Sequence, residues 1–547
     1  MDPVDRSGQG DPRARARTRT RARGQTRART RVRSGEFPIM TRTQEQPASA
    51  RSRSDASTIA RGAAVNFIGT VARLIKSVSF IVLTRLFGAE IFGLYMLGWT
   101  IVDLVSKVGQ FSLDKGLVNF IPRMREDGET EAIHRTIAQA LGVGLLLSAG
   151  IGAALYAAAA PLADGLLDKP RLAGMLRLLA VGMPLIALTQ IILGVTRAHK
   201  VMKHDAMVRG AVEPLVLFAA ACVLFYAGWR TYGIAAAHLA ALACGLLYAV
   251  YVFTRFYSWR ACLVHLRALR AVSPLTRFSL PVMGYELVYM FMIRLDVLMV
   301  GYFLPAAQVG VYVIAVEIAL VTKKVRQWFD PVFSPIVAEL NHRNDLRRLE
   351  INLRLVTRWV LTIGLAFLCV VSLVGNELLG LFGPEFVSGF MTMVVLAMSQ
   401  VVYAAMGSGD TVLIMSGRPW LNLVNTVAVV VVNFVLNLWL IPALGILGAA
   451  LGTLAAFGLL TLIRLAEVYQ LFRILPLSWR ILKPCAAAVP AFACAYLAGD
   501  YTPDIPWLRM AALPTIFLAT YLGVLGLLGL EEDDRVALRR LRGRGGP

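Results

Sequence analysis

Runs of about 20 consecutive apolar residues recur along this chain from residue 59 to residue 530, and they constrain its fold more than any other feature. A bilayer core about 30 Å thick is crossed by one helix of that length. Of the 547 residues, 57% are hydrophobic and 16% are charged, and the mean hydropathy is +0.63, which is unlike an ordinary soluble domain. Barrel strands would alternate apolar and polar residues, whereas segments such as 142–160 and 427–443 are continuously apolar. The sequence therefore predicts an all-α, polytopic membrane protein.

The apolar runs predict about 14 transmembrane helices. We place them at 60–86, 91–113, 136–159, 173–196, 207–228, 233–256, 278–303, 308–328, 355–375, 386–408, 421–442, 445–469, 483–499 and 508–530.

The basic residues of the chain indicate its orientation in the membrane. A net charge of +22 would suggest a nucleic-acid partner in a soluble protein, but here the basic residues lie in the two tails and in alternate loops. Such loops are found at 115–135, 197–203 and 323–348, while the intervening loops are nearly bare. The positive-inside bias places basic loops in the cytoplasm. We therefore expect a bacterial inner-membrane protein with both termini in the cytoplasm and no nucleic-acid partner.

A repeat divides the spans into two halves. Segment 84–95, after the first span, resembles segment 301–312, after the seventh, and segment 233–237, which opens the sixth, resembles segment 445–449, which opens the twelfth. Small residues recur in both pairs and allow helices to approach closely. Because six spans separate the copies, the halves have the same orientation, as in transporters with parallel repeats. Two pseudo-symmetric six-helix lobes with two extra C-terminal helices are therefore expected.

The domain organisation follows from this division. The Arg-rich N-terminal tail is too polar to form a core and should be disordered, and the sequence leaves open whether translation starts at Met1 or at Met40 and what the tail does. We expect the tail at 1–57, an N-lobe at 58–257, a cytoplasmic linker at 258–277, a C-lobe at 278–472, two further spans within 473–530 and a cytoplasmic tail at 531–547.

Charged residues within the spans are the candidate functional residues, because a charge near the bilayer centre costs on the order of 2.5 to 3.5 kcal/mol on insertion scales. They gather in the first, second, seventh and eighth spans, whereas the last six spans hold almost none at depth. The bases, candidates for binding an anionic substrate, are Arg73, Lys76, Lys107 and Arg294. The acids, candidates for ion coupling or charge balance, are Asp103, Glu286, Asp296 and Glu317.

Two interpretations of these charges stay open. The residues could form internal ion pairs that only lock the bundle, such as Asp103 with Arg73, or Asp296 with a base on a neighbouring helix. Alternatively, they line a hydrated cavity between the lobes in which the bases face an anionic ligand. Arg and Lys both suit phosphate, so a phosphate-bearing substrate is the natural expectation.

No pattern for metal binding or nucleotide hydrolysis appears in the sequence. The six cysteines are scattered without paired spacing, and the six histidines, of which only His238 falls within a span, are expected to be surface residues. The chain has no HExxH segment, no Walker A run and no dinucleotide fingerprint. We therefore expect no metal, no cofactor and no ATP hydrolysis, so that transport would draw on an H⁺ or Na⁺ gradient or on the gradient of the substrate itself.

Segments 85–95, 278–281, 294–296, 309–312 and 445–450 together resemble Wzx-type polysaccharide and O-antigen flippases. These belong to the multidrug/oligosaccharidyl-lipid/polysaccharide exporter superfamily, with a MATE-like fold, and the resemblance covers roughly residues 58–530 through diffuse motifs. It implies a cavity lined by spans one, two, seven and eight. It also implies movement of an undecaprenyl-diphosphate-linked oligosaccharide from the cytoplasmic to the periplasmic leaflet by alternating access. The implied partners are the lipid-linked oligosaccharide, the lipid bilayer and polysaccharide assembly proteins.

Three other functions compete with this one. A lipid II-type flippase would share the architecture, and an ion-coupled drug antiporter of the same superfamily would favour carboxylates over bases in its cavity. A membrane glycosyltransferase or polymerase would need a sizeable extracytoplasmic loop, and the outer loops are very short. We therefore expect a transporter and not an enzyme, while the glycan, the coupling ion and the oligomeric state stay open.

Overall fold

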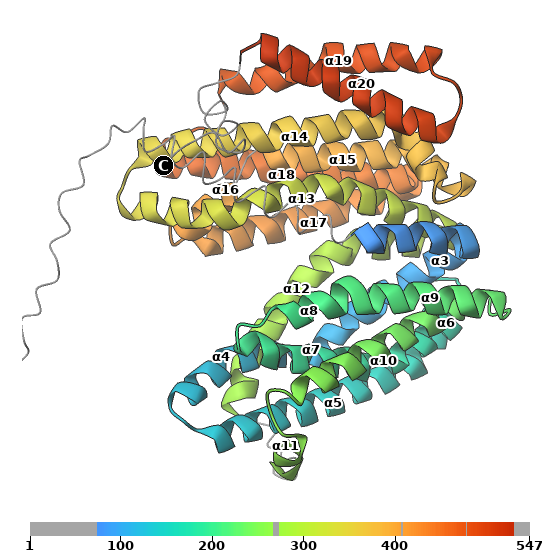
Figure 1. Cartoon of the computed structure of the whole chain (residues 1–547), viewed down its shortest axis with the longest axis vertical. Coiled ribbons are helices and arrows are strands. Elements are labelled where there is room, and N and C mark those ends of the chain that lie inside the picture. Colours follow the sequence, from blue (N-terminus) through green and yellow to red (C-terminus); the bar gives the residue numbers. More distant parts are fainter. Residues whose placement is uncertain (1–73, 266–272, 406–408, 477, 530–547) are drawn as a thin grey trace, which may run out of the picture. The chain divides into compact units, whose positions relative to one another are not determined.

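The computed structural model describes residues 74–265, 273–405, 409–476 and 478–529, and every regular element in these ranges is a helix. Figure 1 shows long helices in all of them. The prediction of an all-α chain is confirmed. The predicted tail at 1–57 and the candidate Arg73 lie outside the described residues, and the boundaries proposed for the lobes, the linker and the tails stay predictions.

The first group of helices, which we call the N-terminal group, runs from α3 to α11. Its long members pack on one another, with α9 against α10, α4 against α7, and α5 against α6 and α7. The group comprises α3 (Leu74–Gln110), α4 (Leu113–Glu126), α5 (Thr130–Ala160), α6 (Pro170–Val181), α7 (Met183–Ala198), α8 (Lys203–Met207), α9 (Glu213–Tyr226), α10 (Gly233–Phe253) and α11 (Trp259–His265).

The second group, the C-terminal group, runs from α12 to α18 and is followed by two further helices. The last two, α19 and α20, pack on each other and on α14 (Figure 1). The elements are α12 (Pro274–Phe303), α13 (Ala306–His342), α14 (Leu346–Gly380), α15 (Phe390–Ala405), α16 (Gly409–Met415), α17 (Pro419–Leu444), α18 (Ile446–Phe472), α19 (Leu482–Tyr501) and α20 (Pro506–Leu527).

Twelve helical segments in the described ranges are long and apolar enough to cross a membrane. The end of the first predicted span and the whole of the second fall in one of them, Val78–Glu126, and α12 is not among the twelve. Four of the 30 residues of α12 are charged, yet at ~1.5 Å per residue the helix is about 45 Å long, enough to cross a bilayer core. The chain is a multi-pass membrane protein.

A bend at Gly88 separates the two spans that α3 contains. Gly88 has φ 73° and ψ 170°, a conformation that residues with a Cβ rarely adopt, and it falls where the sequence predicts the connection between spans one and two. The rings of Phe80 and Phe92 pack edge to face across the bend with centroids 5.6 Å apart. The bend is therefore held by packing on both sides.

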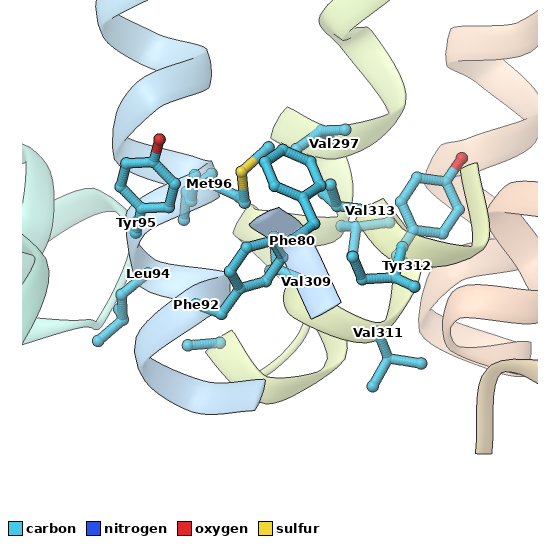
Figure 2. Packing of buried hydrophobic residues seen from close by; sticks show 14 of the residues in the cluster. Phe80, Phe92, Leu94, Tyr95, Met96, Val297, Val309, Val311, Tyr312 and Val313 are labelled. Atoms are coloured by element: carbon cyan, nitrogen blue, oxygen red, sulfur yellow. The ribbon is translucent and has the colours of Figure 1, made fainter. Parts of the chain in front are cut away.

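The largest buried cluster lies where α3 meets α13, and Figure 2 shows Phe92 of α3 and Val309 of α13 within it. The repeated small residues meet each other here. A Cβ on Gly93 would lie 1.8 Å from the carbonyl oxygen of Ala306, and a Cβ on Gly310 would lie 2.5 Å from that of Ala89. The backbones of the two helices thus touch directly, as small residues at helix interfaces permit.

Candidate functional site

An ion pair joins the N-terminal and C-terminal groups at the second half of α3. The Nη2 of Arg294 on α12 lies 2.7 Å from the Oδ2 of Asp103 on α3, and the side chains of Arg294 and Asp103 are 27% and 16% exposed. The Nε of Arg294 is buried without a hydrogen-bond partner in the structure. The guanidinium therefore retains a donor that a ligand could use.

A second polar contact between the groups lies where α3 ends. Phe111 and Ser112 have φ 51° and 46°, an uncommon pair of left-handed residues that breaks the helix between α3 and α4. The break brings the Ser112 hydroxyl to the Oε2 of Glu286 at 3.2 Å, and the Nζ of Lys115 lies 3.6 Å from the Oε1 of the same carboxylate. We call Asp103, Lys107, Glu286 and Arg294, with Ser112 and Lys115, the charged seam.

The other three bases predicted to bind substrate fall into two situations. Lys107 is half-buried one helical turn beyond Asp103, and it has no hydrogen-bond or ion-pair partner among the described residues. Lys76 lies in the first turns of α3, but its side chain is outside the described residues, as Arg73 is entirely. The acid Glu317 is half-buried on α13.

Asp296 is half-buried in a different place from the other candidates. Its carboxylate accepts hydrogen bonds from Asn437 on α17 and Thr453 on α18, each at 2.8 Å, and from the Tyr312 hydroxyl on α13 at 3.4 Å. All three donors are neutral, and no base pairs with Asp296 among the residues that the structure describes. The suggested partner of Asp103, Arg73, lies outside the described residues, and within them Asp103 pairs with Arg294.

Two buried polar groups correct the sequence interpretation further. His238 is only 9% exposed, and its Nδ1 lies 2.7 Å from the hydroxyl of Tyr95, so the prediction of a surface histidine is wrong. The expectation of almost no deep charges in the last six spans also passes over a buried arginine there. Arg464 of α18 is 5% exposed and, like Arg326 of α13, lies over the ring of Tyr403, at 5.5 and 5.2 Å. Arg464 falls inside the predicted span 445–469, so the sequence itself contained this signal.

Asp410 completes that network by pairing with Arg326. Burying an arginine is costly, and the cost is commonly offset by stacking its guanidinium on an aromatic ring and by pairing it with a carboxylate.

Residues 59–326 match the family model described as polysaccharide biosynthesis protein. This similarity to the family covers just under half of the chain. Relatives from Haloferax volcanii are a probable low-salt glycan biosynthesis flippase, Agl15, 29% identical over 174 residues, and a probable flippase, AglR, 28% identical over 209 residues. The matches cover 31% and 37% of this chain and only 36% and 41% of the length of those relatives. Stage V sporulation protein B of Bacillus subtilis is 23% identical over 79% of this chain and 86% of its own length.

Two solved structures show the same fold. The lipid II flippase MurJ in an inward closed conformation has a TM-score of 0.66 and 13% identity, and the match covers 84% of this chain and 98% of that one. A multidrug resistance MATE transporter of the MOP superfamily, in an inward-facing conformation, has a TM-score of 0.55 and 14% identity over 73% of this chain and 94% of that one. The chain therefore has the MATE- and MurJ-like fold that the sequence predicts.

Proposed function

We propose that this protein is a flippase that moves a lipid-linked oligosaccharide, an undecaprenyl-diphosphate glycan, across a bacterial inner membrane by alternating access. In this proposal both termini are cytoplasmic, and the product feeds cell-surface polysaccharide assembly. The family match over residues 59–326 and the similarity to two probable flippases of Haloferax volcanii support it.

The observation that carries the proposal is the charged seam. Asp103 and Arg294 are paired across the two groups of helices, the Nε of Arg294 is unpartnered, and Lys107 lies beside them without a partner among the described residues. A diphosphate entering the seam would take the place of the Asp103 carboxylate on the guanidinium and gain the Lys107 ammonium. Arg binds such oxygens through its planar fork, and Lys adds a point charge. Without substrate, the Asp103 carboxylate would pair with Arg294 and hold the two groups of helices together.

The seam also separates the proposed flippase from its rivals. A drug antiporter for cations would need unpaired carboxylates there, but Asp103 and Glu286 each have a basic partner. A lipid II-type flippase would use the same diphosphate chemistry, so only the glycan distinguishes it. The fold of MurJ keeps that alternative open.

The test is leaflet transfer of a fluorescent polyprenyl-diphosphate oligosaccharide by the purified full chain in liposomes. We expect transfer by the wild type and a loss of at least tenfold in Arg294→Gln and in Lys107→Gln, because each removes a charge-assisted contact to the diphosphate. Arg135→Gln is the matched control, since Arg135 on α5 is exposed and pairs only with Glu131 along its own helix. Absence of transfer together with efflux of a cationic dye would overturn the proposal and favour the antiporter.

We further propose that Asp296 is the group that couples transport to H⁺ or Na⁺. An ionised carboxylate buried among neutral donors is costly, whereas a bound proton or cation removes that cost. The oxygen atoms of Asp296, Thr453 and Tyr312 lie close together between α12, α13 and α18 and could serve a small cation.

The coupling proposal predicts that Asp296→Asn transfers the fluorescent lipid at a rate independent of imposed H⁺ and Na⁺ gradients. The exposed Asp127→Asn serves as the control. A variant that still responds to either gradient as the wild type does would exclude Asp296 as the coupling group.

A further inference from the structure

A cleft lies at the end of the molecule that carries the turn between α12 and α13, and we call it the polar cleft after the four charged residues in its otherwise largely apolar lining. The cleft has a volume of about 700 Å³, within the ~300–1,000 Å³ of typical ligand pockets. Its charged lining consists of two acids and two bases, which are Glu90, Asp168, Lys169 and Arg171. These four residues are an exception to the bare loops expected on this side of the membrane.

Two of the four charges of the polar cleft pair with each other, and a third donates to the backbone. Arg171 of α6 lies 3.0 Å from Glu90 of α3, with both side chains more than half exposed. The Nζ of Lys169 donates to the carbonyl oxygen of Gly301 on α12 at 2.7 Å and so ties the two groups of helices together. Burial lowers the pKa of Lys169, although Asp168 beside it raises it. A balanced set of donors and acceptors favours a neutral, hydroxyl-rich ligand over a bare phosphate.

An apolar groove begins where the polar cleft ends. It has a volume of about 400 Å³ and runs between α12 and α17, lined by Phe291, Leu295, Leu298, Met299, Tyr302, Phe303, Phe434 and Leu438. Tyr302 and Phe303 line both spaces, and their rings pack edge to face with centroids 4.9 Å apart. The hydroxyl of Tyr302 is the only polar side-chain group in the groove lining.

We infer that the groove and the cleft together form a release site for the transported lipid, with its polyprenyl chain in the groove and its sugars in the cleft. The site rests on the proposed function. Only an amphipathic ligand with an apolar chain and a large polar head matches both spaces at once. The volume of the cleft exceeds that of the groove, which fits a glycan better than a simple headgroup. In the predicted topology the α12–α13 turn faces the periplasm, where the product leaves.

Photo-cross-linking of the full chain in lipid nanodiscs tests the chain-binding part. Benzoylphenylalanine replaces Leu438 in the groove or, as the matched control, its neighbour Trp439, which is 79% exposed on the same helix and does not line the groove. The probe is a radiolabelled polyprenyl-diphosphate disaccharide. We expect strong labelling at position 438 that excess unlabelled probe displaces, and little at 439. Equal labelling at both positions, or labelling of phospholipid at 438 that the probe does not displace, would overturn the site.

The glycan-binding part is tested in the same labelling assay at position 438. Glu90→Gln combined with Arg171→Gln should lower labelling by the disaccharide probe about fivefold, as expected for lost hydrogen bonds to a ligand. Labelling by sugar-free polyprenyl diphosphate should not change. Glu131→Gln with Arg135→Gln removes a similarly exposed ion pair from α5 and is the control. Equal losses for both probes would place the sugars elsewhere.

The same preparation separates this inference from the proposed function. If the wild type transfers the disaccharide probe between leaflets but does not label at position 438, the release site is wrong and the flippase stands. If no transfer occurs, the flippase itself is wrong.

Discussion

The helix α3 meets the C-terminal group at two contacts of opposite chemistry. Near the middle of α3, Gly93 lies against the backbone of Ala306 on α13 within the largest buried cluster. Closer to the end of α3, Asp103 pairs with Arg294 of α12 in the charged seam, where both side chains keep some exposure to solvent. The first contact depends on shape alone, whereas the second depends on charge.

This difference indicates how the two contacts could open in turn. Separation at Gly93 exposes backbone that was in direct contact, and the diphosphate of the proposed ligand does not replace that contact. Separation at the seam leaves charges that a diphosphate can satisfy, so the ligand itself favours opening there. In the proposed alternating access, the charged seam would therefore respond to the ligand, whereas the contact at Gly93 would not.

Substitution at the contact of Gly93 with Ala306 should lower the stability of the protein more than substitution in the charged seam. In Gly93→Ala the added Cβ would lie 1.8 Å from a backbone oxygen that cannot move aside as a side chain could. We expect a loss of about 3 kcal/mol, at the upper end for overpacked sites, and a clear fall in Tm measured by tryptophan fluorescence in detergent. The control is Gly150→Ala on α5, where a Cβ meets nothing within 4 Å. Equal Tm values for the two variants would show that α3 and α13 do not touch at Gly93.

Loss of the Asp103–Arg294 ion pair should have the second-largest effect on stability. Arg294→Ala leaves the Asp103 carboxylate mostly buried and unpaired, and partial exposure reduces the cost of a fully buried charge to about 1–3 kcal/mol. The reversed pair, Asp103→Arg with Arg294→Asp, should recover part of this stability because the attraction is restored. A double-mutant cycle on Tm and on chemical unfolding measures the coupling. Additive effects of the two single variants would contradict the pairing.

The helical fold could be predicted from the sequence, because continuous apolar runs specify the spans. The repeated glycines at positions 93 and 310 were visible as small residues that allow close approach, but only the structure shows that they meet each other. The seam was predictable only in part. Asp103 and Arg294 were both recognised as deep charges, but the partner of Asp103 depends on how α3 and α12 cross, and no local pattern contains that.

The separation of Asp296 from Arg294 has a simple geometric reason. Two residues apart on a helix means a rotation of about 200°, so their side chains leave α12 on nearly opposite sides. Arg294 therefore reaches α3, while Asp296 reaches Asn437 and Thr453 on α17 and α18. The sequence places Arg294 and Asp296 in one charged cluster, because it does not show which distant helices pack on each side of α12. His238 was misplaced for a similar reason, since its partner Tyr95 is 143 residues away.

The ion pair of Glu286 with Lys115 should contribute the least stability in the seam. Its dependence on salt tests whether the seam is held by charge while the contact at Gly93 is not. Lys115 is half-exposed, so Glu286→Gln should cost only about 0.5 kcal/mol, as partly exposed ion pairs do. Raising the salt concentration from 0.05 M to 0.5 M should erase this loss, because the Debye length falls from roughly 14 Å to roughly 4 Å. The loss in Gly93→Ala should not change over the same range, since no charge takes part. If instead both variants respond to salt alike, or neither does, the seam and the contact at Gly93 do not differ in their dependence on charge. The ligand-sensitive role assigned to the seam then loses its physical basis.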